Sequence, residues 1–197
     1  MSNSNNVTAG KPKITGSVWV APVGTTLPTS TTESLNAAFK ELGYVSDAGI
    51  TNSNSPSNTA IKAWGGATVL DVQTDKPDTF KMAFIEATNV DVLKQIYGDN
   101  NVSGTLETGI TIHANNEEQS TKSLVIDMVL KNGTAKRIVL PTCKVTAVGD
   151  ITYADGSVIG YDTTLSCYPD TNGHTHHEYI KGAQGATGAT GATSAVG

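Results

Sequence analysis

The chain has 197 residues and a formal net charge of −5, because 18 acidic residues outnumber 13 basic ones. This charge argues against a domain that grips nucleic acid by neutralising phosphates. The sequence has no apolar run of about 18 residues and no signal-peptide core, so it predicts neither a membrane span nor secretion.

Residues 1–13 are polar and without period, so we expect a flexible N-terminal arm. Residues 14–22 read as a first strand, with Val18 and Val20 on one face and Trp19 on the other. From there to residue 173 the chain is rich in Thr, Ser, Asn, Val and Gly, and only 16% of all residues are charged. This composition is typical of strands and turns, and the length suits one domain with an appendage.

Residues 47–77 lie between two predicted strands and are interrupted by Gly, Ser and Asn. A structureless loop of this length is unusual inside a compact domain, so we expect a long hairpin that leaves the body. Two further strands of the same sandwich are the alternative. A projecting hairpin would act as an assembly arm, because its apolar residues would need a partner surface. These residues are Ile50, Ile61, Trp64, Val69, Leu70 and Val72.

Residues 79–86 alternate, with Phe80, Met82 and Phe84 on one face of a predicted strand. The period then changes to that of a helix. Thr88 and Asn89 are expected to cap this helix, and Gly98 to end it. The stripe that should dock on the sheet consists of Val92, Leu93 and Ile96.

The second half of the chain predicts strands at residues 105–114, 143–152 and 160–168, with a turn at Asp155-Gly156. Residues 122–131 and 134–140 predict a hairpin across Asn132-Gly133, the sequence that favours a type I′ turn. Its first strand is apolar on both faces, so we expect a helix or another subunit to cover the outer one.

Residues 174–197 follow the last predicted turn and are expected to form a flexible tail rich in His and Gly. His174, His176, His177 and Glu178 could chelate a metal, but a tail has no scaffold to fix their geometry, so no metal site is predicted. Cys143 and Cys167 lie in neighbouring predicted strands. They suit buried free thiols better than a disulfide framework, yet a mutual bridge is within reach, and the sequence does not decide between the two.

Catalytic signatures are missing from the sequence: it contains no nucleophile elbow, phosphate loop, zinc-protease motif or paired Cys-x-x-Cys. We therefore expect neither an enzyme nor a cofactor. The predicted fold is mainly β: a two-sheet β-sandwich or barrel-like body with one flanking α-helix and a long extended β-hairpin arm.

Several segments together resemble the major tail tube proteins of long-tailed, siphovirus-type bacteriophages. The resemblance covers roughly residues 14–170 and is carried by residues 16–28, 38–46, 86–98 and 137–141 and by the strand ending at Tyr168-Pro169. It implies a structural virion protein, made in the host cytoplasm, that forms stacked hexameric rings. Other tail proteins would bind at the tube ends, and double-stranded DNA would pass passively through the lumen. No membrane partner is expected. The alternative from another class is a β-sandwich binding module, such as a carbohydrate-binding or adhesin-like domain.

Overall fold

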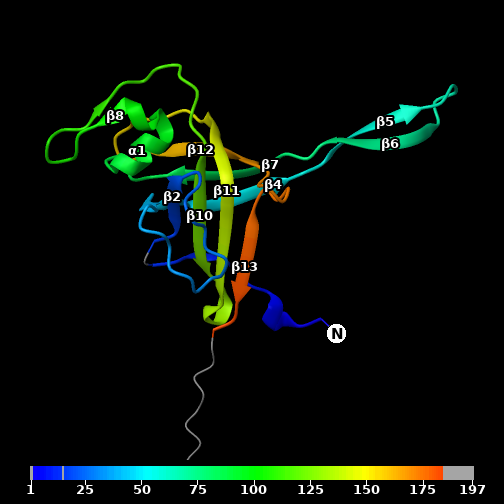
Figure 1. Cartoon of the computed structure of the whole chain (residues 1–197), viewed down its shortest axis with the longest axis horizontal. Coiled ribbons are helices and arrows are strands. Elements are labelled where there is room, and N and C mark those ends of the chain that lie inside the picture. The colour runs from blue at the N-terminus through cyan, green and yellow to red at the C-terminus, as the bar shows by residue number, and fades with distance from the viewer. Residues whose placement is uncertain (1, 15, 184–197) are drawn as a thin grey trace, which may run out of the picture.

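The computed structural model describes residues 2–14 and 16–183 and shows a mainly β protein with one α-helix in that part of the chain (Figure 1). The helix α1 spans Val90–Tyr97, and short 3-10 turns lie at Ser4–Asn6, Asp99–Asn101 and Lys131–Gly133. The strands are β1 (Lys11–Pro12), β2 (Val18–Pro22), β3 (Lys40–Glu41), β4 (Val45–Asn54), β5 (Ser57–Lys62), β6 (Thr68–Asp75), β7 (Asp78–Phe84), β8 (Val102–Ser103), β9 (Thr111–Ile112), β10 (Lys122–Val129), β11 (Ala135–Val148), β12 (Tyr161–Tyr168) and β13 (His177–Lys181).

One antiparallel sheet of nine strands forms the body, in the order β3-β2-β10-β11-β12-β7-β4, with β1 beside β10 and β13 beside β11. The long strand β11 is central, because its first part pairs with β13 and its second part with β12. The predicted mainly β class with one helix is confirmed, although hydrogen bonds join the strands of the body into one sheet rather than two.

The two ends of this sheet are joined by a very short connection, which makes the body barrel-like. Strands β3 and β4 are the outermost strands on opposite edges, yet only residues 42–44 link them. The amide of Leu42 donates to the carbonyl of Val18 on one side (2.9 Å), and the amide of Ile85 donates to the carbonyl of Tyr44 on the other (3.1 Å). The sheet must therefore curl until its edges meet at this link.

The inside of the curled sheet holds the main core. Phe80, Met82 and Phe84 of β7 are buried there, as the alternation predicts. Residues from β2, β10, β11 and β12 complete the same cluster, together with the buried stripe of α1. The sheet and α1 thus pack against each other through this apolar inner face, because neither can bury its apolar side chains alone.

An irregular segment, residues 23–39, covers the outer face of β10 and β11. Val125 and Val139 are buried on this face against Ala21 and Phe39, with Leu27 and Leu35 packed around them. The prediction that a helix or another subunit covers this face is therefore wrong, since a loop of the same chain does so. The loop contains no helix, and its apolar residues reach the sheet from turns and irregular backbone.

The β10–β11 hairpin turns as its sequence predicts. Asn132 and Gly133 both have positive φ, 60° and 72°, and the amide of Thr134 donates to the carbonyl of Lys131 at 3.4 Å. Positive φ at both central positions is the type I′ geometry, which matches the twist of the flanking strands. The turn at Asp155-Gly156 is likewise confirmed, with Gly156 at a φ of 79°.

The described parts of the two terminal segments differ from the predicted flexible segments. At the N-terminus β1 pairs with β10, and the amide of Lys131 donates to Thr8 Oγ1 at 2.7 Å. At the C-terminus β13 pairs with the first part of β11. The flexible-tail prediction is therefore wrong for residues 177–181, while residues 184–197 lie outside the described part of the chain. The strand predicted at residues 105–114 is also wrong, because only Thr111–Ile112 is a strand and the rest is loop, exposed except at the half-buried Ile110.

Candidate functional site

Within the arm predicted at residues 47–77, strands β5 and β6 form a two-stranded ribbon that projects from the body (Figure 1). Within residues 2–14 and 16–183, strands β5 and β6 pair only with each other, and every residue of both is exposed. From Ser57 to the turn at Gly65-Gly66 the ribbon reaches about 30 Å at the usual rise of a β-strand. A lone two-stranded ribbon is marginal in water, so this one stands without the support that a third strand would give.

The ribbon has one apolar and one polar face. Ile61 lies opposite Leu70 and Thr59 lies opposite Val72, and these two pairs share a face because their positions differ by two residues. Ile61, Leu70 and Val72 are 48%, 53% and 40% exposed. The opposite face carries the pair Ala60 and Asp71 and the pair Asn58 and Gln73, and Asn58 Nδ2 donates to Asp71 Oδ2 at 3.2 Å.

The tip of the ribbon carries the largest exposed apolar side chain of the arm. The turn at residues 63–67 is closed by a hydrogen bond from the amide of Ala63 to the carbonyl of Ala67 (2.8 Å). Trp64 lies within this turn and is fully exposed, and Val69 nearby is 62% exposed. A tryptophan at this exposed tip offers a large apolar contact area to a partner.

Ile50 belongs to the body rather than to the projecting ribbon. It pairs with Met82 across β4 and β7 and packs against the main core. Its assignment to the set of unpartnered arm residues is therefore corrected, because β4 is an edge strand of the sheet as far as Asn54. The projecting arm begins only beyond the pair Asn54 and Asp78.

The base of the arm is fixed at Asp78, whose side chain is buried. Asn52 Nδ2 donates to its Oδ1 at 2.8 Å, Thr175 Oγ1 donates to its Oδ2 at 2.6 Å, and His176 Nδ1 lies 2.5 Å from Oδ2. Burial alone would raise the pKa of Asp78, but the hydrogen bonds from Thr175, His176 and Asn52 outweigh it and hold the pKa below its usual value. No local sequence pattern predicts this cluster, because its members are far apart in the chain.

The helix α1 is capped and docked at the body end opposite the C-terminal strand (Figure 1). Asn89 Oδ1 accepts hydrogen bonds from the amides of Asp91 and Val92, whereas Thr88 is exposed and outside the cap. Val92, Leu93 and Ile96 are 0%, 2% and 5% exposed and lie in the main core.

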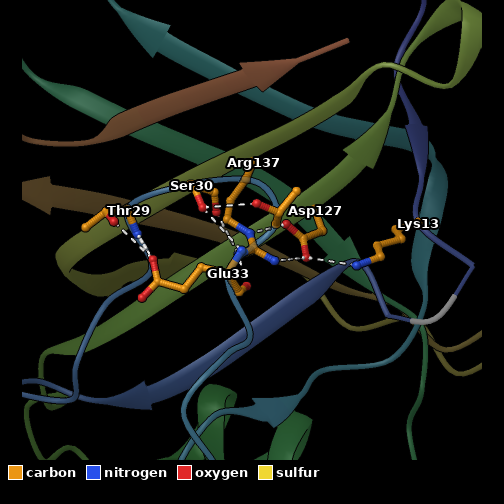
Figure 2. A network of polar contacts seen from close by, with 7 residues as sticks. Lys13, Thr29, Ser30, Glu33, Asp127 and Arg137 are labelled. Atoms are coloured by element: carbon orange, nitrogen blue, oxygen red, sulfur yellow. Dashed lines mark hydrogen bonds and ion pairs between the residues drawn. The ribbon is translucent and has the colours of Figure 1, made fainter. Parts of the chain in front are cut away.

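A buried ion pair ties the covering loop to the outer face of the sheet (Figure 2). Arg137 and Asp127 lie opposite each other on β11 and β10, with Nε to Oδ1 at 2.6 Å and Nη2 to Oδ2 at 2.8 Å. Arg137 Nη1 also donates to the carbonyls of Ser30 and Glu33 in the loop, at 2.9 and 2.7 Å. The guanidinium therefore has partners on two elements at once, and Lys13 adds a longer ion pair of 3.7 Å to Asp127.

The histidine-rich segment separates into three groups instead of forming one cluster. His176 binds Asp78 at the arm base, and Glu178 forms an ion pair with Lys136 at 2.8 Å. His174 and His177 meet at Asp170, a residue that the sequence analysis did not single out.

The two cysteines face each other across β11 and β12. Cys143 and Cys167 are directly opposed in register, and both are buried free thiols. Burial raises the pKa of Cys143 far above its usual value and that of Cys167 to about 12.

Comparison with known families supports one assignment. No helix in the described residues is long and apolar enough to cross a membrane. The comparison with curated proteins gives no match. The model of the family described as "Phage tail tube protein" matches residues 1–190. This match spans nearly the whole chain, and the chain accordingly belongs to the phage tail tube protein family.

Proposed function

We propose that this chain assembles with itself into hexameric rings that stack into the tube of a phage tail, through which DNA is ejected into the host. Membership of the tail tube family supports a structural role in the virion over the alternative of a carbohydrate-binding or adhesin-like module, and over an enzyme. The observation that carries the proposal is the projecting ribbon β5–β6 with its unpartnered apolar face.

The apolar face of the ribbon docks on a neighbouring subunit. Burying a side chain such as Ile, Leu or Val fully contributes about 1.5–3 kcal/mol, and Ile61, Leu70 and Val72 still expose about half of theirs. Each arm therefore has a few kcal/mol of apolar burial left to gain, and Trp64 adds the largest single contribution. Repeated around a ring, these contacts give a closed assembly in which every arm has a partner.

The charge of the chain suits a passage for DNA. A formal net charge of −5 gives a surface that repels phosphates rather than binding them. Tight phosphate binding would hold the DNA and oppose its movement, so an acidic subunit favours sliding over capture. Other proteins of the tail bind at the two ends of the tube, where the stacking surfaces of the terminal rings are free.

Electron microscopy of the purified full chain tests the proposal, with two matched variants that place the same charge on opposite faces of the ribbon. Ile61→Lys puts a cation on the apolar face and should abolish rings and tubes while the chain stays folded and soluble. Ala60→Lys puts it on the polar face and should leave assembly intact. Tubes of normal length from Ile61→Lys, or equal loss in both variants, would contradict the proposed docking face.

A shortened arm gives an independent test. Asn54 and Asp78 lie opposite each other in the β4–β7 pair, so a short Gly-Asn-Gly turn can replace residues 55–77 without displacing either strand. The product should be a folded monomer by analytical ultracentrifugation and circular dichroism. In the full chain with Trp19→Phe, the remaining fluorophore Trp64 should shift its emission to shorter wavelength when tubes form. Unchanged emission on assembly would show that the arm tip stays in solvent.

A further inference from the structure

Three side chains of types that can ligate a metal ion lie close together at the turn before β13 and at the first residue of that strand. The ligand atoms of Asp170, His174 and His177 all lie within 4.8 Å of one another. His177 Nε2 is 3.2 Å from Asp170 Oδ2, and His174 Nδ1 is 3.8 Å from Asp170 Oδ1. The two imidazole rings meet edge to face, with centroids 5.3 Å apart.

Backbone hydrogen bonds fix the carboxylate of Asp170 and the strand position of His177 without an ion. The amides of Asn172 and His174 donate to Asp170 Oδ1 at 2.8 and 2.9 Å, which fixes the carboxylate and leaves Oδ2 facing His177. The turn is closed by the amide of Asp170 donating to the carbonyl of His174, at 2.8 Å. His177 lies on β13, opposite Val139 of β11, so its position is set by the sheet.

We propose that Asp170, His174 and His177 bind a divalent transition metal ion of the Zn²⁺ type. One carboxylate and two imidazoles form the mixed oxygen and nitrogen ligand set that such ions prefer. Ligand atoms in a tetrahedral zinc site lie about 3.3 Å apart, given bonds of about 2.0 Å. The Asp170–His177 distance already matches this value, and His174, with a side chain that is 59% exposed, can rotate to close the remaining gap.

The neighbouring candidate ligands are engaged elsewhere, which limits the site to these three residues. His176 Nδ1 is bound at Asp78, and Glu178 is paired with Lys136. The fourth tetrahedral position is left for a water molecule. The proposal does not depend on the proposed assembly, since all three ligands come from one chain.

Isothermal titration of the full chain with ZnCl₂ tests the proposal, using protein purified through an affinity tag without histidine. We expect one Zn²⁺ per chain. His174→Gln and His177→Gln should each weaken binding at least tenfold, and Asp170→Asn should do the same. His113→Gln is the matched control, because it removes the one histidine that lies outside the C-terminal segment, and it should leave the affinity unchanged.

Two further readouts separate a defined site from surface adsorption. The Co²⁺-substituted protein should show the intense visible absorption of tetrahedral coordination, and His177→Gln should lose it. Zn²⁺ at about a hundredfold excess over Kd should raise the melting temperature by roughly 5 °C or more, because the ion binds the folded chain alone. The proposal is overturned if no binding occurs, if binding survives all three substitutions, or if the histidine control abolishes it.

Discussion

Removing the guanidinium of Arg137 should destabilise the protein strongly, because its carboxylate partner would be left buried. Asp127 is 6% exposed, and in Arg137→Leu its nearest remaining cation would be Lys13 at 3.7 Å, a side chain that is largely in water. Breaking a buried ion pair from one side costs about 3–5 kcal/mol. The carbonyls of Ser30 and Glu33 would lose their donors in the same variant. We therefore expect a loss of about 4 kcal/mol, or roughly 10 °C in melting temperature.

The double variant Asp127→Leu and Arg137→Leu shows which cause destabilises Arg137→Leu: the unpaired buried carboxylate of Asp127, or the lost attraction between the two side chains. With both charges gone, two apolar side chains face each other on an outer face that is already lined by Val125 and Val139. Such a replacement is often close to neutral, so the double variant should be markedly more stable than Arg137→Leu alone.

Urea denaturation followed by tryptophan fluorescence measures both variants. Of the two tryptophans, Trp64 is fully exposed in the folded chain, so the signal change on unfolding comes from Trp19, which packs beside the covering loop. A loss below about 1 kcal/mol in Arg137→Leu would refute the reasoning. So would a double variant whose loss equals the sum of the losses in Arg137→Leu and in Asp127→Leu alone, since the two sites would then be independent.

Three further predictions concern the core, the thiols and the arm base. Leu93→Ala should cost about 2–4 kcal/mol in urea denaturation through a cavity under α1, and a loss below about 1 kcal/mol would mean that the helix is loosely docked. Cys143 and Cys167 should resist iodoacetamide at pH 8 until the chain is unfolded, because burial raises both pKa values; fast labelling of the native protein would contradict this. The lowered pKa of Asp78 contributes stability that is present above the pKa of the unfolded carboxyl, about 3.9, and is lost as the pH falls through the folded value. In Asp78→Asn the free energy of unfolding should therefore fall less steeply as the pH is lowered. An unchanged fall would show that other carboxylates determine the acid dependence.

Local patterns in the sequence were sufficient wherever neighbouring residues decide the structure. The alternation of Phe80, Met82 and Phe84 specifies which face of β7 is buried, and Asn89 caps α1 through amides only two and three residues away. The Asn132-Gly133 turn is equally local, because few residues other than Asn and Gly tolerate positive φ at both central positions. In each case the interaction that decides the structure joins residues only a few positions apart in the sequence.

Contacts between distant segments could not be predicted in the same way. Arg137 and Asp127 lie on facing strands, but the loop that contacts Arg137, residues 23–39, is about a hundred positions away in the sequence, and its residue pattern does not indicate which strands it covers. The strand β13 was missed because it shows no apolar alternation and three of its five residues are exposed, and its pairing with β11 depends on the unoccupied edge that β12 leaves. Residues 105–114 show the reverse error: apolar residues alternate there, but in the described part of the chain only Thr111–Ile112 pairs with another strand, β8.

The arm combines a fixed base with a free outer part, and this division follows from its contacts. Asp78 binds Asn52 from the arm side and Thr175 and His176 from the C-terminal segment, so three segments of the chain share one buried carboxylate. Beyond Asn54 the ribbon has only its own cross-strand bonds. A base held by the core fixes the direction in which the ribbon leaves the body, which reduces the orientational entropy that docking must overcome. The unsupported outer part can still adjust to a partner surface. The base at Asp78 therefore sets the direction of the ribbon, and the residues beyond Asn54 adapt to the partner.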